Sequence, residues 1–391
     1  MLGTLGARDA SLGNDVPYDA AAWAAVEHGE RPTGDELADA FFHLARIEER
    51  RAPGSARDRH GRFPAAASCL DPLDPPLERL RAHLGLDPPR WFGARFAVAL
   101  THDVDVPRRW TRVGLRGGGA RIKAAVAKGQ PRTAVREAAA LATVPVHKAR
   151  GTDPNWTFER VVGEESERGA RSTFFVLAGH AHAADGPSAS AYERVRPRLV
   201  ATLLERGAEV GLHGSYRAAD DPSRLAAEQA ALESLAGSVP GQRFHYLRID
   251  PHRNLRSLEV LGFRYDSSLG FADAIGFRAG IVQPFRPWDA EADRVLDLVE
   301  IPLAAMDATL GEPRYLGLSA EMAEGRLLAL LDRAAEQGGG FALLWHNEWF
   351  DERAFPGWGR LYFRLIDGVA ERGGVCVSAG ELAEEAAAWL P

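Results

Sequence analysis

The sequence predicts an α/β fold: a distorted (β/α) barrel with parallel strands, preceded by a small α-rich N-terminal domain. From residue 95 onward, short apolar runs alternate with helix-like stretches, and glycine commonly ends a helix before the next run. Alternation of this kind gives a parallel sheet. Polar residues follow nearly every strand at its carboxyl end, and such a rim is typical of a barrel rather than an open sheet.

Residues 1–90 are expected to form the α-rich domain and a connector. An amphipathic helix is predicted from Asp35 to Arg51, where apolar residues recur at helical spacing. The prolines between residues 70 and 89 predict a rigid connector, because proline fixes φ and disfavours helix before it. The barrel is then expected to take residues 91–391.

The strands of the barrel are predicted from apolar runs of four to seven residues, which are typical of buried strands. These runs are Phe96–Leu100, Ser172–Leu177, Glu209–Leu212, Phe244–Leu247, Leu296–Ile301, Phe341–Trp345 and Val375–Val377. The helices between them are predicted at Phe158–Arg168, Tyr192–Arg206, Ser223–Leu235, Leu255–Leu261, Ala320–Gln337 and Gly359–Arg372.

Composition excludes several classes of protein. The chain has 391 residues, 46% of them hydrophobic and 26% charged, with a net charge of −7. These values exclude disordered, collagenous and membrane-embedded chains, and without a basic excess no nucleic-acid partner is expected. The start lacks a basic segment followed by an apolar run, so we expect a cytoplasmic protein. Cys69 and Cys376 are expected to be two buried thiols.

One segment departs from this balance. Residues 107–150 contain eleven Arg or Lys and a single acid, Glu137. The length of the segment marks it as an insertion, because barrel loops are normally short. It is expected to be either a solvated helical flap or a basic helix that contacts an anionic polymer or an anionic membrane surface.

The first strand carries the strongest chemical signal. Asp103 and Asp105 are two residues apart at its end, so an extended backbone points both carboxylates the same way, about 6–7 Å apart at Cα. Such a pair can share a metal ion or a water molecule, although it also suits a loop cap. His213 alone suits a surface histidine. Together, on neighbouring positions of one rim, these residues predict a functional site.

Six short motifs resemble, in their order along the chain, those of the polysaccharide deacetylases, the carbohydrate esterase family 4 with the NodB homology domain. They are Thr101–Asp105, Ser172–Val176, Gly211–Tyr216, Arg243–Arg248, Gly262–Gly270 and Leu344–Asn347. The resemblance covers about residues 95–385. Two further segments, Phe41–Glu49 and Asp58–Phe63, resemble an N-terminal region that accompanies a bacterial branch of the family.

This resemblance implies a metal-dependent hydrolase that removes N-acetyl groups from sugar units of a polysaccharide or glycoconjugate, with zinc as the usual metal. It implies Asp103 as the general base, Asp105 and His213 as metal ligands, and His346 as the general acid. Arg243 or Arg248 would keep Asp103 ionised through a charge-assisted hydrogen bond. The residues expected to bind substrate are Tyr216, Tyr246, Trp345 and Asn347.

The chain departs from the family pattern at Arg217, where a second histidine is usual. Asp105 and His213 are too few ligands for a tight zinc site, so another residue completes the site, zinc binds weakly, or the barrel has lost its metal. We expect His245 as the third ligand, because strand alternation puts it on the face opposite Arg248. His346 and water are the alternatives.

Two other functions stay open at this point. The same fold can hydrolyse another small amide or imide, because barrels host many reactions through their loops. Arg217 also allows a non-catalytic carbohydrate-binding barrel.

Overall fold

The computed structural model describes residues 20–32, 34–186 and 189–390. The first nineteen residues, on which the expectation of no secretion signal rests, lie outside this part of the chain. Among the described residues, no helix has the length and apolar character needed to cross a membrane.

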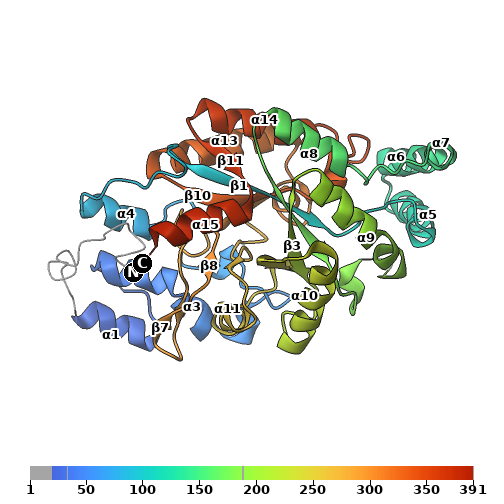
Figure 1. Ribbon diagram of the computed structural model, residues 1–391. Coiled ribbons are helices and arrows are strands. Elements are labelled where there is room, and N and C mark those ends of the chain that lie inside the picture. Colours follow the sequence, from blue (N-terminus) through green and yellow to red (C-terminus); the bar gives the residue numbers. More distant parts are fainter. Residues whose placement is uncertain (1–19, 33, 187–188, 391) are drawn as a thin grey trace.

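A curled sheet of parallel strands forms the centre of the molecule, which confirms the predicted fold class (Figure 1). Its strands are β1 (Ala97–Val104), β2 (Thr173–Leu177), β3 (Glu209–Gly214), β4 (Gly241–Phe244), β5 (Tyr265–Asp266), β8 (Val299–Glu300), β9 (Leu303–Met306), β10 (Gly340–Leu344) and β11 (Val375–Val377). The order is β8-β5-β4-β3-β2-β1-β10-β9, and β11 also pairs with β1. A two-stranded antiparallel sheet, β6 (Trp288–Asp289) and β7 (Arg294–Val295), lies apart from it.

The chain itself joins the two edges of the large sheet. The edge strands β8 and β9 are consecutive in the sequence, and only Ile301 and Pro302 separate them. The main-chain N–H of Ile301 donates to Asp266 on the β5 side, whereas the carbonyl of Pro302 accepts from Ala342 on the β10 side. The sheet therefore curls into a distorted barrel.

Helices surround the barrel (Figure 1). They are α8 (Phe158–Glu167), α9 (Ala189–Glu205), α10 (Pro222–Ala236), α11 (Pro251–Val260), α12 (Asp307–Gly311), α13 (Ala320–Gln337), α14 (Trp358–Glu371) and α15 (Ala379–Trp389). Each predicted barrel helix is present, with its ends shifted by a few residues at most.

Two predicted strands are wrong in extent. β4 ends at Phe244, and His245–Leu247 form a 3-10 turn in which Tyr246 and Leu247 have φ of 62° and 53°. These left-handed residues end the strand, so the alternation argument for His245 does not apply. β8 is limited to Val299–Glu300, which pair with the two residues of β5.

The predicted helix from Asp35 to Arg51 is two helices, α2 (Glu36–Leu44) and α3 (Ile47–Arg51). Arg46 between them has φ 52°, which a continuous helix does not permit. The described part of this region also contains the α-helices α1 (Ala20–His28) and α4 (Pro76–His83). Apolar side chains of α2 and α4 belong to the same buried cluster as the barrel strands. The domain boundary near residue 90 stays a prediction.

A buried ion cluster also connects this region to the barrel. Arg278 makes a bidentate contact with Glu49, at 2.8 and 2.7 Å, and Arg46 donates to the same carboxylate at 2.9 Å. All three side chains are almost completely buried. Burial opposes ionisation of Glu49, but the charges of Arg278 and Arg46 outweigh it and lower the pKa of Glu49 to about 2.

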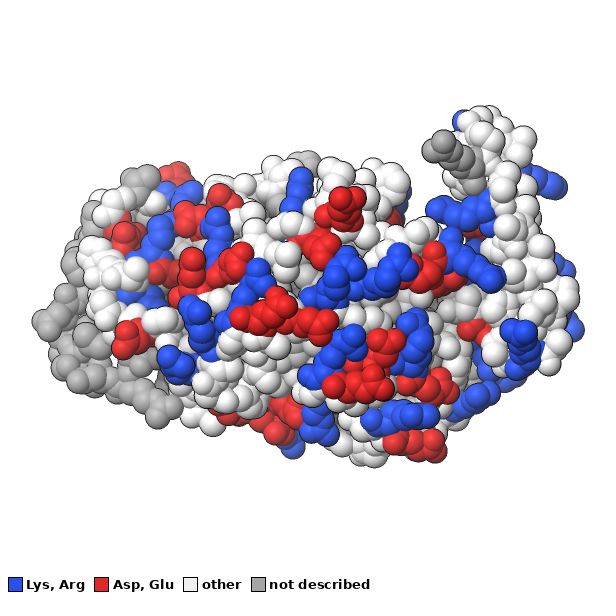
Figure 2. Space-filling view, turned by 90° about the horizontal axis from the view of Figure 1, so that it is seen from above, with Lys and Arg blue, Asp and Glu red and all other residues white. Residues whose placement is uncertain are grey.

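The basic insertion is helical, as both of its expected forms require. It consists of α5 (Arg112–Ala127), α6 (Pro131–Ala142) and α7 (Val144–Arg150), which project from one end of the barrel (Figure 1). Among the charged side chains on this projection, Lys and Arg outnumber Asp and Glu, whereas basic and acidic side chains intermix elsewhere on the visible face (Figure 2). Its contact with an anionic polymer or membrane surface stays a prediction.

We expect Glu49→Gln to lower the free energy of unfolding by about 3–5 kcal/mol at pH 7, because two buried guanidiniums lose their counter-charge. The stabilisation requires an ionised Glu49, so it is present above the unfolded pKa of about 4.3 and is lost as the pH falls toward 2. Urea denaturation across this pH range measures the difference. Glu164→Gln, which removes a more exposed ion pair, is the control and should cost less than about 1 kcal/mol. Equal effects of the two substitutions would contradict this account.

Candidate metal centre and catalytic pocket

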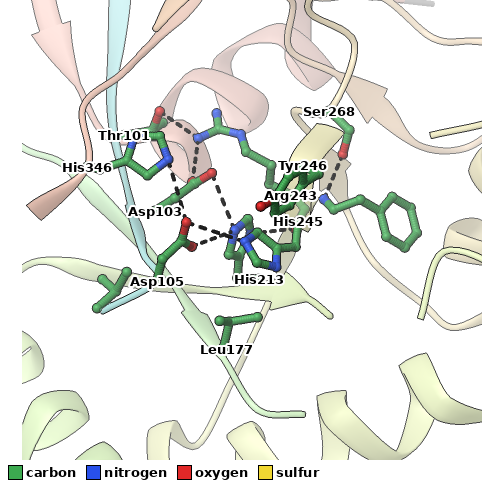
Figure 3. Close-up of polar contacts among 12 residues, drawn as sticks. Thr101, Asp103, Asp105, Leu177, His213, Arg243, His245, Tyr246, Ser268 and His346 are labelled. Atoms are coloured by element: carbon green, nitrogen blue, oxygen red, sulfur yellow. Dashed lines mark hydrogen bonds and ion pairs between the residues drawn. The ribbon is translucent and has the colours of Figure 1, made fainter. Parts of the chain in front are cut away.

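Five side chains from four parts of the rim meet at the carboxyl end of the barrel (Figure 3). β1 carries Asp103, and Asp105 follows it directly. β3 carries His213, the turn after β4 carries His245, and His346 follows β10. The residues whose types and order suggested a site are therefore brought together, although their chemical roles stay predictions.

Hydrogen bonds determine which nitrogen each of two histidines presents. Nδ1 of His213 lies 2.9 Å from the main-chain oxygen of Arg243, and Nδ1 of His245 lies 3.1 Å from Oδ1 of Asp185. Both partners are acceptors, so each Nδ1 carries the hydrogen. The remaining nitrogens point to Asp105: Nε2 of His213 lies 3.3 Å from its Oδ1, and Nε2 of His245 lies 3.3 Å from its Oδ2.

This arrangement fits a bound cation. Nε2 of His213 and Oδ1 of Asp105 are buried, and neither makes a hydrogen bond. In neutral imidazoles with hydrogen on Nδ1, both Nε2 lone pairs face the carboxylate oxygens, which is repulsive unless a cation or proton lies between them. One donor atom each from Asp105, His213 and His245 lies within 4.8 Å of the other two. Two imidazole nitrogens and a carboxylate oxygen are a familiar zinc ligand set.

The same contacts explain the proton affinity of His245. Burial opposes its ionisation, but the carboxylates of Asp105 and Asp185 outweigh burial and raise the pKa of His245 to about 9. The pKa of Asp105 lies well below its usual value, because the charge of His245 and the close approach of both imidazoles outweigh the effect of burial. A cation at this site therefore has to replace a proton.

His346 faces the centre from the other side. Its Nδ1 lies 2.7 Å from Oδ1 of Asp307, and its Nε2 lies 3.9 Å from Oδ2 of Asp105. Although burial disfavours the imidazolium, the charge of Asp307 and its hydrogen bond hold the pKa of His346 well above the usual value. A protonated Nε2 is thus available at the edge of the pocket.

Arg243 is the arginine that contacts Asp103. Its Nη1 donates to Oδ1 of Asp103 and to Thr101 at 2.9 Å each, and the guanidinium is completely buried. Oδ2 of Asp103 remains on the site side, 3.5 Å from Nε2 of His213.

Arg248, the alternative partner for Asp103, lies elsewhere. Its side chain donates to main-chain oxygens of His60 and Tyr216 and to the carboxylate of Asp220. The expectation that Arg248 holds Asp103 is therefore wrong, because the turn after β4 directs this arginine to the outer loops.

Two of the residues expected to bind substrate are also placed in the interior. Trp345 is 1% exposed and packs on Trp358 and Tyr362. Asn347 is equally buried and donates to the main-chain oxygens of Val106 and Asn155. Both side chains serve packing in this structure, which corrects the expectation for them.

Arg217 does not enter the site. It is exposed, whereas Asp103 pairs with Arg243, and Asp105 faces histidines. The pairing of Arg217 with a rim aspartate, which would favour a binding protein without metal, is not found.

A pocket of about 260 Å³ opens above the aspartates. Tyr246 lines the pocket, whereas Tyr216 does not. The ring of Tyr216 stacks on that of His182, with 4.3 Å between the ring centres. The outer wall includes Tyr315, Trp349 and Arg62. Arg62 comes from the N-terminal region and donates to the main-chain oxygen of Tyr246 and to the hydroxyl of Tyr315, at 3.1 and 3.0 Å.

Sequence reasoning missed Asp185, Asp307 and Arg62. Asp185 lies in the loop after β2, so its position after a predicted strand could have marked it as a residue of the rim. Asp307 follows β9, a strand that was not predicted. Arg62 lies in the Asp58–Phe63 motif, but nothing local relates that motif to the rim of the barrel.

Comparison with known proteins gives structural matches only. No family model matches the chain, and neither does any curated protein. The chain is similar to a probable polysaccharide deacetylase from Pseudomonas aeruginosa PAO1, with 16% identity over 77% of this chain and 95% of that one and a TM-score of 0.49. It is similar to an allantoinase, with 14% identity, coverage of 78% and 95%, and a TM-score of 0.49. It is also similar to a peptidoglycan deacetylase from Bacillus subtilis, with 13% identity, coverage of 77% and 94%, and a TM-score of 0.35.

We expect Asp185→Asn to weaken zinc binding at this centre by about 10- to 100-fold, because the substitution removes the carboxylate that fixes the ring of His245. Competition with a chelator of known affinity measures the change. Asp332→Asn, on the exposed surface of α13, is the matched control. Unchanged affinity in Asp185→Asn would contradict the role of the Asp185 carboxylate in holding His245 as a ligand.

Proposed function

We propose that the protein is a divalent-metal-dependent hydrolase that removes N-acetyl groups from sugar units of a polysaccharide or glycoconjugate. The observation that carries the proposal is the convergence of Asp105, His213 and His245 beside an arginine-bound Asp103, with His346 across the pocket. The motif resemblance to the polysaccharide deacetylases supports the same reading.

Amide hydrolysis needs a cation or an equivalent electrophile, a base and an acid. Asp105, His213 and His245 would hold the metal, and zinc suits this ligand set. When bound, the cation would polarise the acyl oxygen and make a nearby water more acidic.

Asp103 is the base in this proposal. The bond from Arg243 to its Oδ1 fixes the carboxylate, and Oδ2 stays on the site side to take the proton of the attacking water. Removing this carboxylate leaves the buried guanidinium of Arg243 without its anionic partner.

His346 is the acid. An amine is a poor leaving group unless it is protonated, so a proton has to reach the nitrogen as the carbon–nitrogen bond breaks. Nδ1–H of His346 donates to Asp307, which orients the ring and leaves Nε2 toward the pocket to supply that proton.

The pocket supports a sugar as substrate. Tyr246, Tyr315 and Trp349 offer aromatic surface for the apolar faces of a pyranose ring, and Arg62 and Glu348 offer polar groups beside them. This combination favours a hydroxylated ring over a purely apolar amide.

Acetate release from N-acetylated oligosaccharides, with zinc or cobalt added to metal-free protein, tests the proposal. We expect release that depends on the metal and falls by at least about 100-fold in Asp103→Asn, because that variant lacks the base. Asp332→Asn should match the unmodified protein. Release that persists in Asp103→Asn, or no release from a broad panel of oligosaccharides, would contradict the proposal.

A further inference from the structure

A second cluster of metal-ligating side chains lies in the N-terminal region, among residues that the proposed reaction does not use. It consists of His43 in α2, Glu48 in α3, and Cys69 just after the 3-10 helix η4 (Ala65–Ala67). One donor atom from each residue lies within 4.8 Å of the other two. Cys69 is exposed, so the expectation of two buried thiols is wrong for this residue.

Hydrogen bonds hold Cys69 beside the two helices. Glu48 accepts from the main-chain N–H of Cys69 at 2.6 Å and from the hydroxyl of Ser68 at 2.7 Å. Arg31 donates to the main-chain oxygen of Cys69 at 3.0 Å. These bonds fix the main chain of residues 68 and 69 beside Glu48 and Arg31.

His43 provides an independent indication of a ligand. Its ring is completely buried, and neither Nδ1 nor Nε2 makes a hydrogen bond. The nearest carboxylate is that of Asp39, whose Oδ1 lies 3.5 Å from Nε2. A buried polar group without a partner is destabilising, because it has lost its hydrogen bonds to water. A cation bound by the imidazole would give one of the two ring nitrogens a partner.

We infer that His43, Glu48 and Cys69 form a second metal site, separate from the barrel, that takes a zinc-like divalent transition metal. Thiolate, imidazole and carboxylate are the zinc ligands of proteins, and a thiolate disfavours magnesium and calcium. Water or Asp39 would complete a tetrahedral set. On binding, the proton of the Cys69 thiol passes to solvent and no electron is transferred.

A metal ion bound at this site would cross-link two parts of the N-terminal region. It joins the segment at residue 69 to α2 and α3, and the same stretch of chain, a few residues earlier, carries Arg62 into the wall of the catalytic pocket. Metal that binds only the folded form raises stability, so zinc should increase the melting temperature. The inference does not depend on the proposed hydrolase activity.

Cobalt distinguishes this site from the barrel centre. Thiolate bound to Co²⁺ gives an intense near-ultraviolet charge-transfer absorption, whereas the barrel centre offers only nitrogen and oxygen donors. We would titrate the full-length protein, reduced and metal-free, with Co²⁺ in an Asp105→Asn background. We expect the absorption to saturate at a single cobalt ion per chain and to disappear when Zn²⁺ is added.

Two variants test the ligands. Cys69→Ser should abolish the charge-transfer absorption while the protein stays folded, because the position is exposed and the bond from residue 69 to Glu48 comes from the main chain. Glu48→Gln should weaken cobalt binding by at least about tenfold, and Glu36→Gln, on the exposed face of α2, is its control. The inference is overturned if Asp105→Asn shows no absorption, if Cys69→Ser retains it, or if Glu48→Gln binds cobalt as tightly as the control, which would indicate an adventitious thiol.

Discussion

The carboxyl end of the barrel depends on one electrostatic constraint: three imidazoles have their Nδ1 atoms against acceptors, so three Nε2 atoms converge on the carboxylate of Asp105. Neutral rings in this arrangement would face Asp105 with lone pairs. A cation or protons must therefore lie among them, and the buried Nε2 of His213 without a hydrogen bond points to the cation. The acceptors that bond to the three Nδ1 atoms are a main-chain oxygen and two buried carboxylates. They are thus as necessary for this arrangement of Nε2 atoms as the histidines themselves.

Much of this site could be predicted from the sequence because its residues follow strands. Asp103, Asp105, His213 and His346 lie at the carboxyl ends of apolar runs, and parallel strands bring these ends to one rim. His245 lies close to Asp105 and His213, as predicted. The prediction rested on strand alternation, however, and His245 lies in a turn after the strand. The left-handed Tyr246 and Leu247 turn the chain there, and neither residue type signals such a backbone.

The other wrong or missing predictions about site residues concern positions that long-range packing determines. Asp307 was missed because β9 is a short run after Pro302, and its pairing with β10 is what makes it a strand. Arg248 and Arg243 look equivalent in sequence, yet only Arg243 lies on the strand that faces Asp103. Arg62 reaches the pocket across a separation of more than a hundred residues, which no local pattern records. The N-terminal region therefore contributes to the pocket wall as well as to packing on the barrel.

The central claim is that Asp105, His213 and His245 bind one metal ion. Anomalous diffraction at the zinc absorption edge, from crystals of the full chain grown with zinc, tests this claim most directly. We predict a peak within bonding distance, about 2.0–2.2 Å, of a carboxylate oxygen of Asp105 and of Nε2 of both His213 and His245. A rim without a peak, or a peak bonded to His346 with His245 left out, would contradict the account.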